Sequence, residues 1–116
     1  MDSSQFDLLF QSLAHAARRQ MLDLIQGTPG ITVKALSTHF DMSRIAVLKH
    51  LKSLEAADLV LSKKVGRTRQ LYFNPVPIQL VYDRWTDRYS AFFAGRIADI
   101  KDRVERHAES EDHKSA

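Results

Sequence analysis

The chain has 116 residues, a net charge of +3, an apolar fraction of 44% and no cysteine. This length suits one domain, and the lack of cysteine excludes disulfides, thiolate metal ligands and thiol redox sensing. No apolar run approaches the roughly 20 residues that a membrane-spanning helix needs. The N-terminal segment is acidic and polar before it becomes apolar, so it lacks a signal-peptide pattern. A cytoplasmic protein is therefore expected.

The positive charge is unevenly distributed along the chain. Residues 43–70 hold seven lysines and arginines against Glu55 and Asp58, whereas residues 75–116 hold seven basic and eight acidic residues. A basic stripe confined to one segment indicates a polyanionic partner. Charge alone leaves a simple solvated face as an equal alternative.

Apolar residues at helical spacing predict two helices at the start of the chain. The first covers about residues 4–13. The second covers roughly residues 16–26 and is ended by Gly27 and Pro29.

Two further helices are predicted on either side of a three-residue turn. Thr32 is a favourable N-cap for a helix over residues 33–40, and Ser43 caps another over residues 44 to about 57. Helix, short turn and helix in this order form a helix-turn-helix, a motif that places its second helix in the major groove of DNA.

The second helix of this motif has two distinct faces. At 100° per residue, Val47, Leu51 and Leu54 share one face, which we expect to be buried. The opposite face carries cations, which can donate to guanine acceptors, and the free N–H groups at the helix start can hold a phosphate. The predicted DNA-binding residues of the motif are Thr32, Ser43, Arg44, Ile45, Leu48, Lys49, His50 and Lys52.

Three of these residues have alternative interpretations. Ile45 and Leu48 are apolar on the exposed side, so they either contact thymine methyl groups or pack against protein. His50 borders the buried face and is either a hydrogen-bonded structural histidine or a phosphate contact. If the apolar pair serves a protein, the chain is a winged-helix protein–protein interaction module that has lost specific DNA binding.

A basic hairpin is predicted after the helix-turn-helix. Residues 59–61 and 70–73 favour β-structure and flank Gly66, so a two-stranded wing is expected over about residues 59–73. Cations on a wing can contact the DNA backbone or minor groove, although simple solubility is the alternative. The predicted DNA-binding residues of the wing are Lys64, Arg67 and Arg69.

The C-terminal third carries a long apolar stripe. After the break at residues 74–77, apolar residues recur at three- and four-residue steps and predict a helix over about residues 77–106. A small domain covers only part of such a helix, so a dimer interface is expected, with an aromatic effector pocket as the alternative. The predicted interface residues are Phe6, Leu9, Phe10, Val81, Tyr82, Trp85, Tyr89, Phe92, Phe93, Ile97 and Ile100.

The predicted fold is mainly α with a small two-stranded β-hairpin, a winged helix-turn-helix that is dimeric through its terminal helices. One domain over residues 1–107 is expected, followed by a polar tail at 108–116. The chain has no Gly-rich phosphate loop, nucleophile elbow or metal-ligand cluster, so no enzyme activity, cofactor or metal is expected. The expected partners are double-stranded operator DNA and a second copy of the chain, without a membrane; the sequence identifies no effector.

Five motifs follow one another in an order that resembles a known family. They are F-x-x-L-A-x-x-x-R-R (10–19), M-S-R-x-A-V-x-K-H-L-x-x-L (42–54), A-x-L-V (57–60), G-R-x-x-x-x-Y (66–72) and W-x-x-x-Y-x-x-F-F-x-x-R-I (85–97). Together they resemble the ArsR-type winged-helix repressors, and within them the metal-independent branch often encoded beside START-like proteins. The resemblance implies a homodimer that binds an inverted-repeat operator and represses transcription, often of its own operon.

The chain departs from the family pattern at three places. The usual Asp-Pro-Thr before the paired arginines reads His15-Ala16-Ala17, which weakens the expected N-cap of the second helix. Ile45 and Leu48 replace a proline and a serine on the reading face, so operator sequences inherited from the family do not apply. The thiolate pair of the family's metal sensors falls at Thr32 and Lys34, and the C-terminal helix lacks the paired metal ligands.

Overall fold

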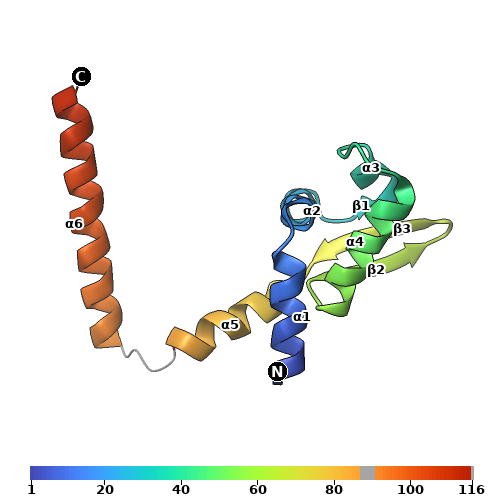
Figure 1. Ribbon diagram of the computed structural model, residues 1–116, viewed down its shortest axis with the longest axis horizontal. Helices are drawn as coiled ribbons and strands as arrows, with labels where there is room; N and C mark the ends of the chain where they lie inside the picture. Colours follow the sequence, from blue (N-terminus) through green and yellow to red (C-terminus); the bar gives the residue numbers. More distant parts are fainter. Residues whose placement is uncertain (87–90, 116) are drawn as a thin grey trace. The chain divides into compact units, whose positions relative to one another are not determined.

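The computed structural model describes the backbone of residues 1–86 and 91–115 and the side chains of residues 1–86 and 96–108. The chain divides into two compact units, Met1–Val81 and Tyr82–Ala116. The elements, in chain order, are α1 (Ser3–Leu13), α2 (Ala16–Gly27), β1 (Ile31–Thr32), α3 (Val33–Ser37), α4 (Arg44–Ala56), β2 (Val60–Val65), β3 (Thr68–Phe73), α5 (Val76–Thr86) and α6 (Ala91–Ser115) (Figure 1).

Side-chain caps explain where the first two helices begin. Asp2 and Gln5 form a capping box, in which each side chain accepts a hydrogen bond from the other's backbone N–H. His15 caps α2, because its Nδ1 accepts a hydrogen bond from the backbone N–H of Ala17 at 3.2 Å. The sequence pattern led us to expect a weakened N-cap for α2, and this expectation is corrected here. The histidine ring supplies the acceptor that the family's aspartate would otherwise provide.

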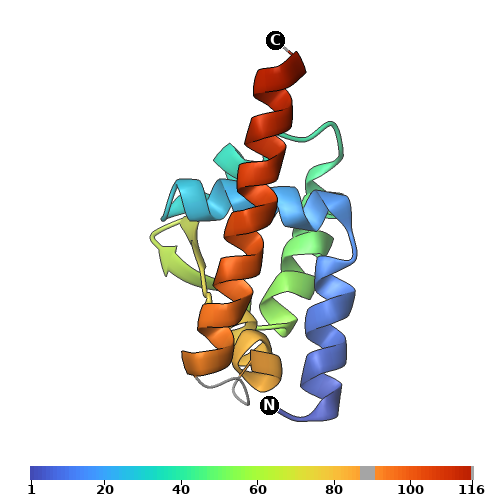
Figure 2. The same ribbon diagram turned by 90° about the vertical axis from the view of Figure 1, so that its left-hand side faces the viewer.

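Helices α1, α2 and α4 enclose the core of the first unit. In Figure 2, α1 and α4 lie side by side and α2 runs across them, in agreement with their mutual contacts. Leu9 of α1 is only 1% exposed and belongs to this core, so its predicted place in the dimer interface is wrong. The core residues are Leu9, Met21, Leu22, Ile25, Ile31, Val33, Leu36, Val47, Leu51, Leu54, Ala57, Leu59, Val60 and Leu71.

The sheet has three antiparallel strands in the order β1-β3-β2. The mainly helical winged-helix prediction is confirmed, but the expected two-stranded hairpin gains β1. This strand pairs Ile31 with Leu71 and is preceded by Gly30, whose N–H donates to the Leu71 carbonyl at 2.9 Å. Gly30 has a φ of +87°, which favours glycine. A strand of two residues is too short to show an alternating pattern in sequence.

The C-terminal region contains α5 and α6 rather than one described helix over 77–106. The segment 87–90 between them lies outside the described residues. Helix α6 continues to Ser115, so residues 108–115, expected as a separate polar tail, are helical. Ion pairs at i,i+4 spacing, Lys101 with Glu105 and Asp102 with Arg106, favour this helix. In the described part of the chain, no helix is both long and apolar enough to cross a membrane.

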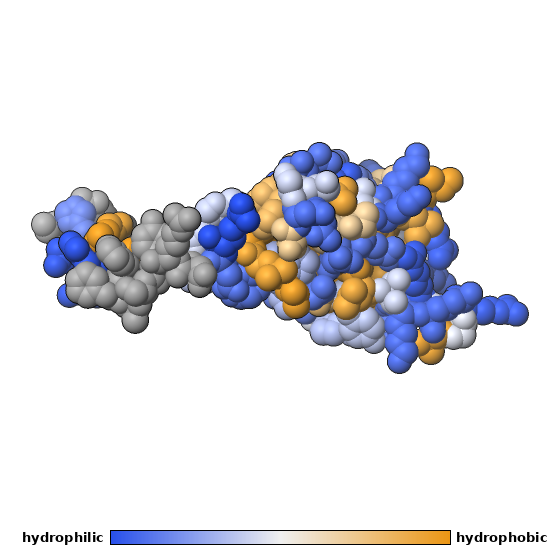
Figure 3. All heavy atoms as spheres, turned by 90° about the horizontal axis from the view of Figure 1, so that it is seen from below, coloured by the Kyte–Doolittle hydropathy of each residue, from blue (hydrophilic) through white to orange (hydrophobic). Residues whose placement is uncertain are grey.

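Both units expose apolar side chains. Apolar patches interrupt the hydrophilic surface on one face of the first unit (Figure 3). Its exposed apolar residues include Leu8, Phe10, Val76, Ile78 and Leu80. Within the second unit, exposed apolar residues follow helical spacing along α6: Ile97, Ile100 and Val104.

Candidate nucleic-acid interface

Helix α4 has a well-defined start and one buried face. The Ser43 hydroxyl accepts a hydrogen bond from the backbone N–H of Ala46 at 3.1 Å, so Ser43 is the N-cap expected from sequence. Val47, Leu51 and Leu54 are completely buried. This buried face fixes the rotation of α4 and turns its other face outward.

The outward face of α4 combines cations with aliphatic side chains. Arg44, Lys49 and Lys52 are exposed. Ile45 is 69% exposed and Leu48 is 37% exposed, and neither belongs to the core. One of the two interpretations of this pair was packing against another part of the protein. The high exposure of Ile45 shows that it does not pack against the rest of its own unit.

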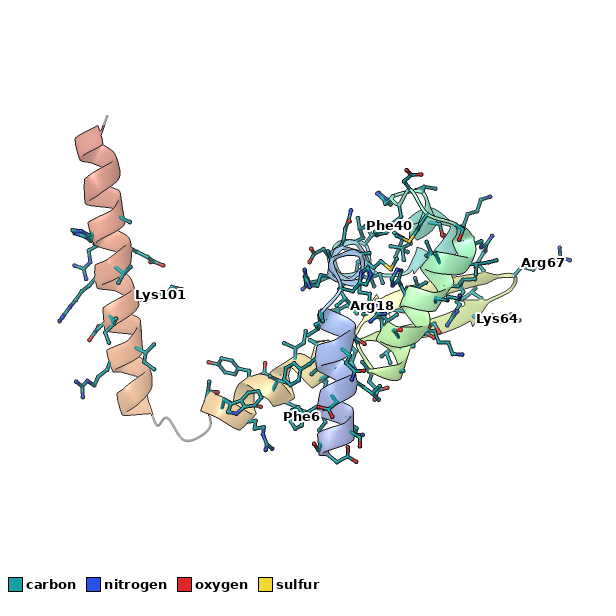
Figure 4. All side chains as sticks on the ribbon, in the orientation of Figure 1. Phe6, Arg18, Phe40, Lys64, Arg67 and Lys101 are labelled. Atoms are coloured by element: carbon teal, nitrogen blue, oxygen red, sulfur yellow. The ribbon has the colours of Figure 1, made fainter. Side chains whose placement is uncertain are left out.

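The β2–β3 hairpin forms the wing. Strand β2 pairs with β3 from Val60↔Phe73 to Val65↔Thr68, so Gly66 and Arg67 alone form the turn. Gly66 has a φ of +61°, a conformation that glycine adopts without steric cost. Arg67 lies at the tip of the hairpin and Lys64 lies on the neighbouring strand (Figure 4), and both are exposed.

A hollow lies between the start of α3, the outward face of α4 and the wing. Its volume is about 240 Å³. Its lining residues, all in the described part of the chain, include four cations and no acid: Thr32, Val33, Lys34, Arg44, Leu48, Arg67, Thr68 and Arg69. Four cations around one hollow provide strong donors for a phosphate group.

Thr32 and Lys34 line this hollow on the side of α3. The Thr32 hydroxyl accepts a hydrogen bond from the backbone N–H of Ala35 at 3.1 Å, so it caps α3 as predicted. Lys34 was not among the predicted DNA-binding residues. Its position two residues after the N-cap Thr32, at the start of the helix-turn-helix, is the sequence signal that could have identified it.

Arg69 has a partner within the protein. Its Nη2 donates a hydrogen bond to Glu55 Oε1 of α4, and the two side chains are 38% and 26% exposed. This ion pair joins α4 to the wing. One Arg69 donor is thus occupied, although the side chain still lines the hollow, and its predicted DNA contact stays a prediction.

His50 faces α2 rather than open solvent. Arg18 Nε donates to His50 Nδ1 at 3.2 Å, and the His15 and His50 rings lie 4.6 Å apart. Burial, and then the neighbouring charges of His15 and Arg18, lower the pKa of His50 below its usual value of 6.5. Arg18 also donates to the backbone carbonyl of Gln11 in α1. His50 is thus hydrogen-bonded within the protein, as its structural interpretation expects, and its predicted phosphate contact stays a prediction.

The predicted interface residues fall into four groups. Phe10, Tyr82, Trp85, Ile97 and Ile100 are exposed. Phe6 and Val81 are half-buried, and Phe6 stacks on Phe10 with ring centroids 6.3 Å apart. Leu9 is buried, as described above. The side chains of Tyr89, Phe92 and Phe93 lie outside the described residues.

Nowhere in the described ranges do three or more His, Asp or Glu residues group as a metal site would require.

Known proteins share this arrangement. The family model of a winged helix-turn-helix DNA-binding domain matches residues 16–60. A Bacillus subtilis (strain 168) protein described as an uncharacterized HTH-type transcriptional regulator, YuzN, is 36% identical over 87 residues, which cover 70% of this chain and 95% of that protein. The chain belongs to the winged helix-turn-helix transcriptional regulators of the ArsR type.

Solved structures agree with this family. An ArsR family transcriptional regulator matches with a TM-score of 0.68 and 28% identity, over 76% of this chain and 90% of that one. An ArsR-like transcriptional regulator from Rhodococcus sp. RHA1 matches with a TM-score of 0.63 and 28% identity, over 85% and 92%. ArsR-type regulators are DNA-binding proteins and not enzymes, so the outward face of α4 and the wing are the candidate DNA-binding surface.

Proposed function

We propose that this ArsR-type regulator is a homodimeric repressor that binds an inverted-repeat operator through the outward face of α4 and the basic wing. The observation that carries the proposal is the hollow lined by Lys34, Arg44, Arg67 and Arg69 between these elements. Two copies would present two recognition helices to half-sites about one helical turn apart. Because the target is chromosomal DNA, we also propose that the protein works in the cytoplasm.

Exposed apolar side chains support the dimer. Ile97, Ile100 and Val104 are 56–64% exposed and form a periodic apolar stripe along α6. Phe10 of α1 and Trp85 of α5 are exposed as well. Burial of such a stripe against the same stripe of a second copy removes this apolar surface from water.

The test is fluorescence anisotropy of the purified protein on duplexes that tile its own promoter. Each duplex is measured at two salt concentrations against a scrambled duplex. We expect tight binding to one tile, two chains per site, and an affinity that falls steeply with salt because phosphate contacts release counterions. Repression is then tested with a reporter gene behind that tile, with and without the protein.

A matched pair of variants locates the binding surface. Lys49→Ala combined with Lys52→Ala removes two charges from the outward face of α4 in each copy, four in the dimer, and we expect it to lower the magnitude of the salt slope by about four. Lys101→Ala combined with Arg103→Ala removes two charges from α6 and should leave the slope unchanged. If the α4 variant bound DNA normally as an intact dimer, the alternative function as a protein–protein interaction module would gain support.

A further inference from the structure

The outward face of α4 has an apolar centre and a charged surround. Ile45 is the most exposed of the large apolar side chains described in the chain, and Leu48 lies one turn further along the same face. Arg44, Lys49 and Lys52 surround the pair and are exposed. An apolar protein partner would have to desolvate these cations to reach the aliphatic groups, and such burial is costly without counter-charges.

Duplex DNA matches this combination of charges and aliphatic groups. Its phosphates pair with cations at the edges of the groove, whereas the floor of the major groove offers one apolar group, the C5-methyl of thymine. Ile45 and Leu48 lie in the first two turns of α4, and the N-terminal residues of a recognition helix are those that contact base edges. Charge complementarity therefore favours DNA as the occupant of this face.

We infer that Ile45 and Leu48 determine operator specificity by contacting thymine methyl groups in each half-site. This inference rests on the proposed function, because it requires α4 to enter the major groove. Side chains at i and i+3 are about 5–6 Å apart at Cβ, and base pairs are spaced by about 3.4 Å. The two methyl groups therefore belong to thymines no more than two base steps apart.

Ile45 has more free surface for a thymine methyl group than Leu48 has. Leu48 lines the hollow beside Arg44 and Arg67, so part of its surface already faces protein atoms. Ile45 is absent from that lining and exposes about two thirds of its surface. The thymine that meets Ile45 is accordingly the more selective position of the half-site.

The test replaces each thymine of the identified operator with deoxyuridine, which removes only the methyl group. Anisotropy then gives the affinity of each substituted duplex. Loss of one buried methyl corresponds to a drop of about four-fold in affinity. We expect such a drop at one or two neighbouring positions in each half-site, and no change at the other thymines.

A double-mutant cycle assigns the effect to the side chain. Ile45→Ala should bind the thymine and deoxyuridine operators equally at the sensitive position, because the methyl no longer has a partner. Leu8→Ala removes another exposed aliphatic side chain, on α1 and outside the candidate DNA-binding surface, and should retain the full difference. Ile45 is exposed, so circular dichroism should find the variant folded.

The outcomes distinguish this inference from the proposed function. If specific operator binding is found but every deoxyuridine duplex binds like the parent, the inference is wrong and the proposed function stands. The same holds if Ile45→Ala keeps the full thymine preference, since another group then reads the methyl. If no duplex binds specifically, both fail, and the apolar pair is a protein-docking face.

Discussion

The two units of this protein carry similar apolar patterns with opposite outcomes. In residues 1–81, the periodic apolar positions of α1, α2 and α4 meet one another and the sheet, and Leu36, Leu51 and Leu71 are completely buried. In residues 82–116, the described apolar side chains of α6 remain exposed. The apolar stripe of a helix is thus buried only where the same unit supplies a second surface.

This difference distinguishes apolar surface that is buried within one unit from apolar surface for which we propose a partner chain. The first unit has its own core, whereas the described large apolar side chains of α6 in the second unit are exposed. The dimer proposed above would give that stripe its second surface. Two experiments test this contrast and a third tests the burial of His50 inside the first unit, from the largest expected effect to the smallest.

The largest effect is expected in the core. Leu51→Ala leaves a cavity beneath α4, where the side chain is fully buried, and should lower the free energy of unfolding by about 2–5 kcal/mol. Ile45→Ala on the opposite face of the same helix should change it by less than about 0.5 kcal/mol. Chemical denaturation of both variants measures the difference. Equal costs would contradict the assignment of buried and outward faces.

A smaller effect on stability, but a large one on binding, is expected in α6. Replacing Ile97 and Ile100 with aspartate should prevent dimerisation, because a charge buried in the interface is costly. Operator affinity should then fall by about 100-fold or more, since the second half-site no longer benefits from linkage. Analytical ultracentrifugation and anisotropy measure the two quantities.

The control for the α6 variant lies on the same helix. Lys101→Gln changes an exposed side chain whose ion pair with Glu105 contributes little. This variant should remain a dimer with parental operator affinity. A fully dimeric Ile97→Asp, Ile100→Asp protein would show that the exposed stripe of α6 is not the interface.

The smallest effect is expected from the pH. The pKa of His50 is lowered, first by burial and then by His15 and Arg18, so the folded state favours its neutral form. The unfolded chain binds more protons as the pH falls below 6.5. The His50 contribution to the free energy of unfolding is therefore complete above this pH and is lost as the pH falls through the lowered pKa.

Denaturation between about pH 5 and pH 8 measures this loss. His50→Gln keeps an acceptor for Arg18 but does not titrate, so it should remove part of the pH dependence. His39→Gln changes an exposed histidine after α3 and serves as the control. An unchanged pH dependence in the His50 variant would contradict the role given to the lowered pKa.

Local patterns in the sequence predicted much of the fold and part of the site. The caps Thr32 and Ser43, the buried face of α4 and the turn at Gly66 depend on residues within about four positions of one another. Features of this kind can be predicted from the sequence because all the residues that determine them are close together in the chain. The outward position of Arg44, Lys49 and Lys52 follows from the same periodicity.

Contacts between distant residues were decided by the tertiary structure alone. Arg18 and His50 are 32 positions apart, and Arg69 and Glu55 are 14 apart. Leu9 lies in the core, where α1 meets α2 and α4, and β1 exists only because β3 offers it a partner. A sequence pattern identifies which side of a helix is apolar, but the surface that covers that side depends on how the whole chain packs. For α6, we propose that a second copy of the chain provides that surface.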